Sequence, residues 1–248
     1  MIRVSAIPYL NTLPFVYGLK QKIIREYITL DFATPSLAAR RLQHGLCDLA
    51  IVPVAAIPDL PYYKIIGTHC IGAVSAVASV LLCSQVPMPQ IKEVALDQES
   101  RTSVLLAQLL LKDYWQVTPR YFSLPVDFPS HCPESAVLIG DKALLYGSQY
   151  PYIYDLAEHW ICWTGKPFVF AAWVANKPLP DGFSALFDEA LAYGLAHIDE
   201  AVASEVGKGF SPKFAQTYLT RNISFSLDEE KYRGLRLFWD KVGILIAS

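Results

Sequence analysis

Small polar residues stand at several points of this sequence where a strand-like segment gives way to a predicted helix. They are Asn11 and Thr12, Ser36, the run Ser100, Arg101, Thr102 and Ser103, and the pair Gly140 and Asp141. In open α/β sheets, ligands bind at the carboxyl ends of strands, where helix N-termini present unpaired N–H groups and a partial positive charge. These junctions therefore predict a site that holds carboxylates or phosphates without needing lysine.

Asn11 is the sharpest single candidate, because its amide can both donate and accept hydrogen bonds. It follows the strand-like segment 2–7 and is flanked by Tyr9 and Pro14. Ser79 is the second candidate, since it lies inside the apolar segment 75–84, where a buried hydroxyl is costly unless it finds a partner. Either Ser79 faces a ligand, or it occupies a plain strand position.

Each candidate also has a purely structural interpretation. Ser, Thr, Asn and Asp are the preferred N-caps of helices, so the hydroxyls at these junctions can be caps and nothing more. Arg101 either pairs with a substrate carboxylate in a bidentate fork or points outward from the first helical turn. Asp48 and Asp97 flank strands, where we expect them to cap or close turns. The aromatic residues expected to belong to the core are Phe168, Phe170 and Trp173.

The elements around these residues alternate as strand, helix and strand with short loops, which is typical of βαβ units. Early strands are expected at 2–7, 27–32 and 48–54, and the helix that opens at 34–36 is expected to end at Gly45. Later strands are expected at 63–67, 75–84, 94–97, 121–122, 136–140 and 168–174, followed by helices over 183–206, 212–220 and 228–246.

Proline-rich joints near residues 86–90 and 177–181 divide the chain into two α/β halves with a helical tail. We predict a first lobe formed by 1–86 and 178–248 and a second lobe formed by 87–177. If the tail returns to the first half, the chain crosses between the lobes twice.

Composition excludes several classes of protein. The chain has 248 residues, is 53% hydrophobic and carries a formal net charge of −2, with no Lys/Arg cluster of the kind that binds nucleic acid. No apolar run approaches the roughly 18 residues that span a bilayer. The first residues lack the apolar core and cleavage site of a secretory signal, so we expect a cytoplasmic location. The oligomeric state is left open.

The five cysteines form no CxxC pair, and the five histidines are scattered. A disulfide framework and a zinc site both need regular ligand spacing that this chain lacks. The sequence therefore predicts buried free thiols and no metal.

The pattern as a whole resembles the chorismate dehydratase family of menaquinone biosynthesis. The resemblance runs over essentially the whole chain and is most specific in YLNT (9–12), SRTS (100–103), IGD (139–141) and PFVFAAW (167–173). It implies the two-lobed, type II periplasmic-binding-protein-like α/β fold, with a mostly parallel sheet flanked by helices in each lobe.

The resemblance also implies an activity, namely the loss of water from chorismate to give 3-[(1-carboxyvinyl)oxy]benzoate, at the start of the futalosine route. Asn11 and Ser79 would be the catalytic residues, and the other junction residues would bind substrate. Aromatisation of the ring supplies much of the driving force, so the enzyme mainly orients groups and stabilises anionic charge. No metal or organic cofactor is required, and the partner is the small-molecule substrate alone.

The junctions hold few acids and no histidine, so no obvious base is present. We hypothesise that the enolpyruvyl carboxylate of the substrate takes the ring proton, and that Asn11 and Ser79 hold this carboxylate in place. Other interpretations are a dihydroxynaphthoate synthase-like enzyme of the same pathway and a non-catalytic carboxylate-binding protein of the same fold. A ligand-sensing domain of a transcription regulator is disfavoured, because no helix-turn-helix segment is evident.

Overall fold

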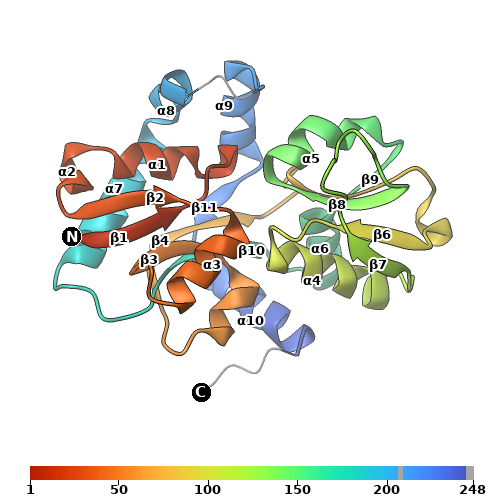
Figure 1. Ribbon diagram of the computed structural model, residues 1–248, viewed down its shortest axis with the longest axis horizontal. Coiled ribbons are helices and arrows are strands. Elements are labelled where there is room, and N and C mark those ends of the chain that lie inside the picture. Colours follow the sequence, from red (N-terminus) through yellow and green to blue (C-terminus); the bar gives the residue numbers. More distant parts are fainter. Residues whose placement is uncertain (206–208, 244–248) are drawn as a thin grey trace.

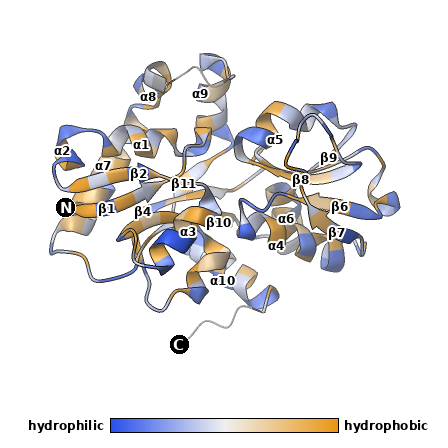
Figure 2. Cartoon of the chain, in the orientation of Figure 1, coloured by the Kyte–Doolittle hydropathy of each residue, from blue (hydrophilic) through white to orange (hydrophobic). Residues whose placement is uncertain are grey.

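The structure of the chain is a computed structural model that describes residues 1–205 and 209–243. The chain forms two lobes side by side, each built on one β-sheet with helices packed against it (Figure 1). Apolar residues concentrate in strands such as those of the left-hand sheet, and hydrophilic residues on outer helices (Figure 2). No helix within the described ranges is long and apolar enough to cross a membrane. The predicted two-lobed α/β fold is confirmed.

The first lobe contains a sheet in the order β11-β4-β10-β3-β1-β2. Its strands are β1 (Ile2–Ala6), β2 (Ile28–Phe32), β3 (Leu49–Pro53), β4 (Lys64–Ala73), β10 (Phe168–Ala175) and β11 (Ser224–Ser226). All residues of β3 and β10 are buried, as a strand covered on both faces requires. The sheet therefore forms the centre of this lobe.

Helices of the first lobe come from both ends of the chain. They are α1 (Leu13–Leu19), α2 (Lys22–Arg25), α3 (Pro35–Gln43), α7 (Phe183–Ala196), α8 (Ile198–Glu205), α9 (Pro212–Arg221) and α10 (Glu229–Lys241). The helix expected over 183–206 is two helices, because the backbone leaves the helical region at His197. Residues 206 and 244–246 of the expected helices lie outside the described residues. The tail returns to the first lobe, where β11 pairs with β4.

The second lobe contains a sheet in the order β7-β6-β8-β5-β9. Its strands are β5 (Val80–Ser84), β6 (Glu93–Leu96), β7 (Arg120–Ser123), β8 (Ser135–Ile139) and β9 (Tyr152–Asp155). Its helices are α4 (Arg101–Leu109), which continues into a π-helical turn, α5 (Gly140–Tyr146) and α6 (Leu156–Thr164). The polar junctions predicted before α4 and α5 are therefore real strand-to-helix transitions.

Two strands lie in sheets other than those implied by the predicted boundaries of 1–86 with 178–248 and 87–177. β5 pairs with β8 and β9 in the second sheet, and β10 pairs with β3 and β4 in the first. The chain thus crosses between β4 and β5 and again between α6 and β10. Proline ends strands and marks loops, but it does not distinguish a loop within a lobe from a crossing between lobes.

Both sheets are mixed rather than mostly parallel. β1 runs parallel to β2 and β3, and β6 runs parallel to β7 and β8, as βαβ units predict. The antiparallel pairs involve the strands that carry the chain between lobes. β4 leaves the first lobe and β10 returns to it, so the two run in opposite directions. β5, which enters the second lobe, is antiparallel to both of its neighbours, β8 and β9.

Helices α1 and α7 cross so closely that their backbones touch. A Cβ atom added at Gly18 would lie 1.9 Å from the carbonyl oxygen of Ala190, and one at Gly194 would lie 1.8 Å from that of Pro14. Only glycine permits this approach, since both distances are far below van der Waals contact. The crossing fixes α1, and with it the loop before α1 that contains Asn11.

Candidate functional site

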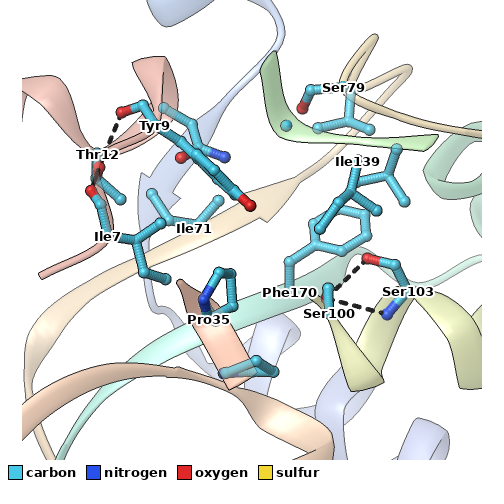
Figure 3. Close-up of a pocket in the computed structure, with 16 residues that line it drawn as sticks. Ile7, Tyr9, Thr12, Pro35, Ile71, Ser79, Ser100, Ser103, Ile139 and Phe170 are labelled. Carbon is cyan, nitrogen blue, oxygen red and sulfur yellow. Dashed lines mark hydrogen bonds between the residues drawn. The ribbon is translucent and has the colours of Figure 1, made fainter. Parts of the chain in front are cut away.

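A pocket lies between the two lobes, where the predicted junctions meet (Figure 3). Its walls come from the loop between β1 and α1, the crossing before β5, the start of α4, the junction of β8 with α5, and β10. The lining residues are Ile7, Tyr9, Asn11, Thr12, Pro35, Pro53, Ile71, Val77, Ser79, Val80, Ser100, Ser103, Ile139, Gly140, Phe170 and Ala171. Asn11, Thr12, Ser79, Ser100, Ser103 and Gly140 are thus brought together by the fold.

The loop that presents Asn11 is held by its own hydrogen bonds. The buried Thr12 hydroxyl donates to the carbonyl oxygen of Ile7 and also lies 2.9 Å from that of Tyr9 (Figure 3). Its hydrogen-bonding capacity is therefore used within the loop. Thr12 supports the loop, and Asn11, which is half-buried, is left to face the pocket.

Ser79 lies just before β5 rather than inside a strand. Its side chain is buried, with 1% of the residue exposed, and its Oγ accepts a hydrogen bond of 2.8 Å from the phenol of Tyr218 on α9. The hydroxyl thus has the partner that its burial requires. Ser79 lies at the crossing between the lobes and lines the pocket at the same time.

Ser100 and Ser103 lie on the second-lobe side of the pocket, at the N-terminus of α4. Ser100 is the N-cap of this helix, because its Oγ accepts from the backbone N–H of Ser103 at 3.4 Å, and the two hydroxyls are 3.1 Å apart (Figure 3). Ser100 therefore caps α4, and both Ser100 and Ser103 also line the pocket. The helix start places a partial positive charge beside the pocket.

Arg101 and Thr102 do not line the pocket. Arg101 is half-exposed and forms an ion pair with Asp59 of the first lobe, so it takes the outward orientation. Thr102 is buried, and its Oγ1 accepts a 3.1 Å hydrogen bond from the backbone N–H of Ala55. Both residues thus make contacts between the lobes, and their contact with a substrate stays a prediction.

Ser36 and Asp141 also lie outside the pocket lining, and each joins the lobes. The backbone N–H of Ser36 donates to the carbonyl oxygen of Glu99 at 3.0 Å. The Asp141 carboxylate accepts from the backbone N–H of Leu10 at 3.0 Å. Both residues stand at helix starts on the boundary between the lobes, outside the cavity. Gly140, the neighbour of Asp141, lines the cavity.

A charged cluster beside the pocket was not predicted from the sequence. The Tyr9 phenol donates to the Glu99 carboxylate, and Lys142 Nζ lies 3.0 Å from Asp97 and 3.3 Å from Glu99. Burial raises the pKa of Asp97 and the nearby Lys142 ammonium opposes that rise. Burial likewise raises the pKa of Tyr9, and the hydrogen bond to Glu99 adds to it, so the phenol stays protonated. Tyr9, which lines the pocket, thus joins the first lobe to the second.

Among the residues that the structure describes, no Asp, Glu, His, Lys or Arg side chain lines the pocket. The same ranges contain no group of three or more His, Cys, Asp and Glu residues placed to hold a metal ion. The polar lining consists of an amide, hydroxyls and helix-start N–H groups, and the remaining surface is apolar, as at Phe170 and Ile139. Such a surface suits a flat, anionic ligand that needs hydrogen bonds to its carboxylates.

Sequence reasoning missed Tyr218 and undervalued Tyr9. Tyr9 lies two residues from Asn11, so its aromatic side chain in the same loop was a usable signal. Tyr218 meets Ser79 across a separation of 139 residues, and no local pattern marks it. Phe168 and Trp173 belong to the core as expected, whereas Phe170 is buried and also contributes to the pocket wall.

The fold is shared with structures of low sequence identity. A protein from Archaeoglobus fulgidus matches with a TM-score of 0.75 at 15% identity, covering 98% of this chain and 96% of its own. The periplasmic aliphatic sulphonate binding protein of Escherichia coli matches with a TM-score of 0.61 at 16% identity, covering 100% of this chain and 94% of its own. These likenesses show a periplasmic-binding-protein-like fold.

Sequence comparison is more specific. A curated chorismate dehydratase from Thermus thermophilus is 30% identical over an alignment of 198 residues, and the match covers 71% of this chain and 72% of that protein. The family profile described as menaquinone biosynthesis matches residues 2–243, a range that includes the whole pocket. On this match the chain belongs to the menaquinone biosynthesis family.

Proposed function

We propose that this protein is a chorismate dehydratase, a hydro-lyase that converts chorismate to 3-[(1-carboxyvinyl)oxy]benzoate in menaquinone biosynthesis. One structural observation carries the proposal. Asn11 and Ser79 converge with the helix start at Ser100 and Ser103 in one pocket between the lobes. The pocket offers hydrogen-bond donors to the two carboxylates of chorismate, and the chorismate dehydratase relative supports the choice of substrate. A cytoplasmic location stays a prediction from the sequence.

The reaction breaks one C–H bond and one C–O bond of the substrate ring. Removal of the ring proton spreads negative charge onto the ring carboxylate. The neighbouring hydroxyl then leaves with that proton as water, and the ring becomes aromatic. The donors at the start of α4 and in the Asn11 loop would stabilise the anionic charge as it develops. Closure of the lobes, which Tyr9 and Glu99 join, would exclude bulk water from the anion.

The base in this proposal is the enolpyruvyl carboxylate of chorismate, held by Asn11 and Ser79. It is supported by the pocket lining, which holds no carboxylate or imidazole in the described part of the chain. Asp141, an alternative acid, is engaged by the Leu10 N–H. An Asp141→Asn variant should keep turnover, because the amide oxygen still accepts that bond. Lost turnover with substrate affinity and fold intact would assign the proton to the protein.

The test of the activity is direct. Purified protein is incubated with chorismate and no added cofactor, and the products are separated and weighed by mass spectrometry. We expect an aromatic product that has lost one water, formed in proportion to enzyme. Chorismate that is bound but recovered unchanged from correctly folded protein would instead indicate a carboxylate-binding protein without this chemistry.

A further inference from the structure

Tyr218 is buried behind the pocket and touches both residues proposed to act on the substrate. It lies on α9, with 2% of its surface exposed, and is not among the lining residues. Its phenol donates to Ser79 Oγ at 2.8 Å, and the side chain of Asn11 also forms a hydrogen bond with it. One phenol thus connects the first loop of the chain with the crossing between lobes.

The hydrogens at this junction can be counted. A phenol has a single proton, and that of Tyr218 is committed to Ser79. The contact with Asn11 must therefore use an amide N–H of Asn11 as donor and the phenol oxygen as acceptor. This contact fixes the orientation of the Asn11 amide, and Asn11 lines the pocket. Ser79, which accepts from Tyr218, is left with its own proton to donate elsewhere.

We propose that Tyr218 is a positioning residue, which sets the orientation of the Asn11 amide and the Ser79 hydroxyl toward the bound carboxylate. This assignment rests on the proposed function, because it concerns the two side chains that would hold the substrate. Tyr218 itself never touches substrate. It acts through the two groups that do, in the way that outer hydrogen bonds orient the groups of a reactive site.

The surroundings of Tyr218 fit a fixed donor rather than a proton carrier. Burial raises the pKa of Tyr218, and its hydrogen bonds with Ser79 and Asn11 oppose the rise only in part, so the phenol is neutral at all physiological pH values. Its ring is held on the buried face of α9, beside Ala215 and Leu219, and is parallel to the ring of Phe214. A rigid ring gives its hydroxyl one defined position.

The first test compares two Tyr→Phe variants. Tyr218→Phe removes the hydroxyl and keeps the ring, so we expect kcat for chorismate to fall about 10- to 100-fold while KM changes little. Tyr150→Phe is the matched control, because Tyr150 is equally buried in the second lobe and donates to the carbonyl oxygen of Pro133. Each variant should lower Tm by about 2–4 °C. Only Tyr218→Phe should lower kcat.

The second test asks whether Tyr218 acts through its partner. In a Ser79→Ala background, Tyr218→Phe should cost a markedly smaller factor in kcat than in the wild type, since one of the two oriented groups is already absent. Losses that simply multiply would overturn the proposal. So would a Tyr218→Phe enzyme that keeps at least half of the wild-type kcat.

A third readout separates this inference from the activity itself. A crystal structure of Tyr218→Phe without substrate should show that the Ser79 hydroxyl and the Asn11 amide have left their wild-type orientations. Unchanged orientations would overturn the positioning role even if wild-type protein proved inactive on chorismate. Inactive wild-type protein would refute the proposed function, whereas an active wild type with a fully active Tyr218→Phe variant would refute only the present inference.

Discussion

At the scale of single residues, the pocket relies on neutral donors rather than on charged side chains. Asn11, Ser79 and Ser103 line it, and the charged groups nearby are paired with one another, as Lys142 is with Asp97 and Glu99. Neutral donors fixed in an enclosed site stabilise a developing anion without a large cost of reorganisation. In the proposed reaction, the rate of dehydration of the dianionic substrate depends chiefly on how those donors are oriented.

Asn11 should therefore matter for turnover far more than for folding. We expect Asn11→Ala to lower kcat by about 10²- to 10³-fold, the usual effect of removing one donor to an oxyanion. Its half-buried side chain predicts little change in Tm. Steady-state kinetics with chorismate and thermal unfolding check both expectations. Unchanged kcat would remove Asn11 from the mechanism.

Asp48 belongs to the structure rather than to the site, as its position beside a strand suggested. It is 4% exposed, accepts from the backbone and guanidinium of Arg3, and lies 2.8 Å from Lys177. Burial alone would raise the pKa of Asp48, but the hydrogen bonds of Arg3 and Lys177 outweigh it and hold the pKa below its usual value.

The lowered pKa of Asp48 makes a pH-dependent prediction. Its contribution to stability is fully present above the unfolded pKa of 3.8 and is lost as pH falls below that value toward the folded pKa. We expect Asp48→Asn to cost about 2 kcal/mol near neutral pH. In urea unfolding the difference from wild type should shrink below about pH 4. A difference that stays constant from neutral pH to about pH 3 would show that another group dominates.

At the scale of elements, the site depends on α7 and α9, two helices that come from a part of the sequence distant from Asn11 and Ser79. α1 follows the Asn11 loop and crosses α7 through Gly18 and Gly194. α9 brings Tyr218 to Ser79 from the helical tail. The Asn11 loop and Ser79 are thus positioned by helices from the C-terminal third of the chain.

The crossing of α1 and α7 can be tested at Gly18. A methyl group there meets the carbonyl oxygen of Ala190 at 1.9 Å, so we expect Gly18→Ala to destabilise the protein by about 3 kcal/mol. Gly45→Ala serves as the control, since nothing lies within 4 Å of its added Cβ and only its positive φ opposes the change. That variant should lose about 1–2 kcal/mol. Equal losses in denaturant unfolding would contradict the close crossing.

Local signals in the sequence predicted the start of α4 and the end of α3. Ser100 caps α4, and Gly45 has the positive φ that ends a helix. Those features depend on neighbours within a few residues, so residue type and spacing suffice to find them. The edge strands β9 and β11 were missed, because they have only 4 and 3 residues, too few to show a clear alternation of their own.

The candidate site was predicted where it follows strand ends, and missed where it depends on tertiary contacts. Asn11 and the Ser100–Ser103 turn were predicted because they stand at junctions, and Ser79 because a hydroxyl inside an apolar segment is costly without a partner. Arg101 and Thr102 stand at the same helix start, but the helix turns them toward the other lobe. Tyr218 could not be predicted, because its partner Ser79 lies 139 residues away and the sequence does not show which segments meet between the lobes.

At the scale of the whole molecule, hydrogen bonds across the pocket hold the lobes together. Tyr9 bonds Glu99, the Leu10 N–H bonds Asp141, and the Ser36 N–H bonds the backbone of Glu99. These contacts come from the segments that line or border the pocket. Separation of the lobes would break them together and open the pocket to substrate.

Tyr9→Phe should favour separation of the two lobes, because it removes the hydrogen bond from Tyr9 to Glu99 that joins them beside the pocket. We expect a larger radius of gyration in small-angle X-ray scattering of the free variant, and a raised KM for chorismate. Arg101→Ala is the comparison, since its exposed pair with Asp59 also joins the lobes but contributes at most about 1 kcal/mol. If both variants scatter as the wild type does, the Tyr9 contact does not control closure.

The most direct measurement of the central claim is a crystal structure with the stable product, 3-[(1-carboxyvinyl)oxy]benzoate, bound. We predict that the product lies between the lobes, with its enolpyruvyl carboxylate on Asn11 and Ser79 and its ring carboxylate at the helix start formed by Ser100 and Ser103. A product molecule held by one lobe alone, or bound away from Asn11, would contradict the account.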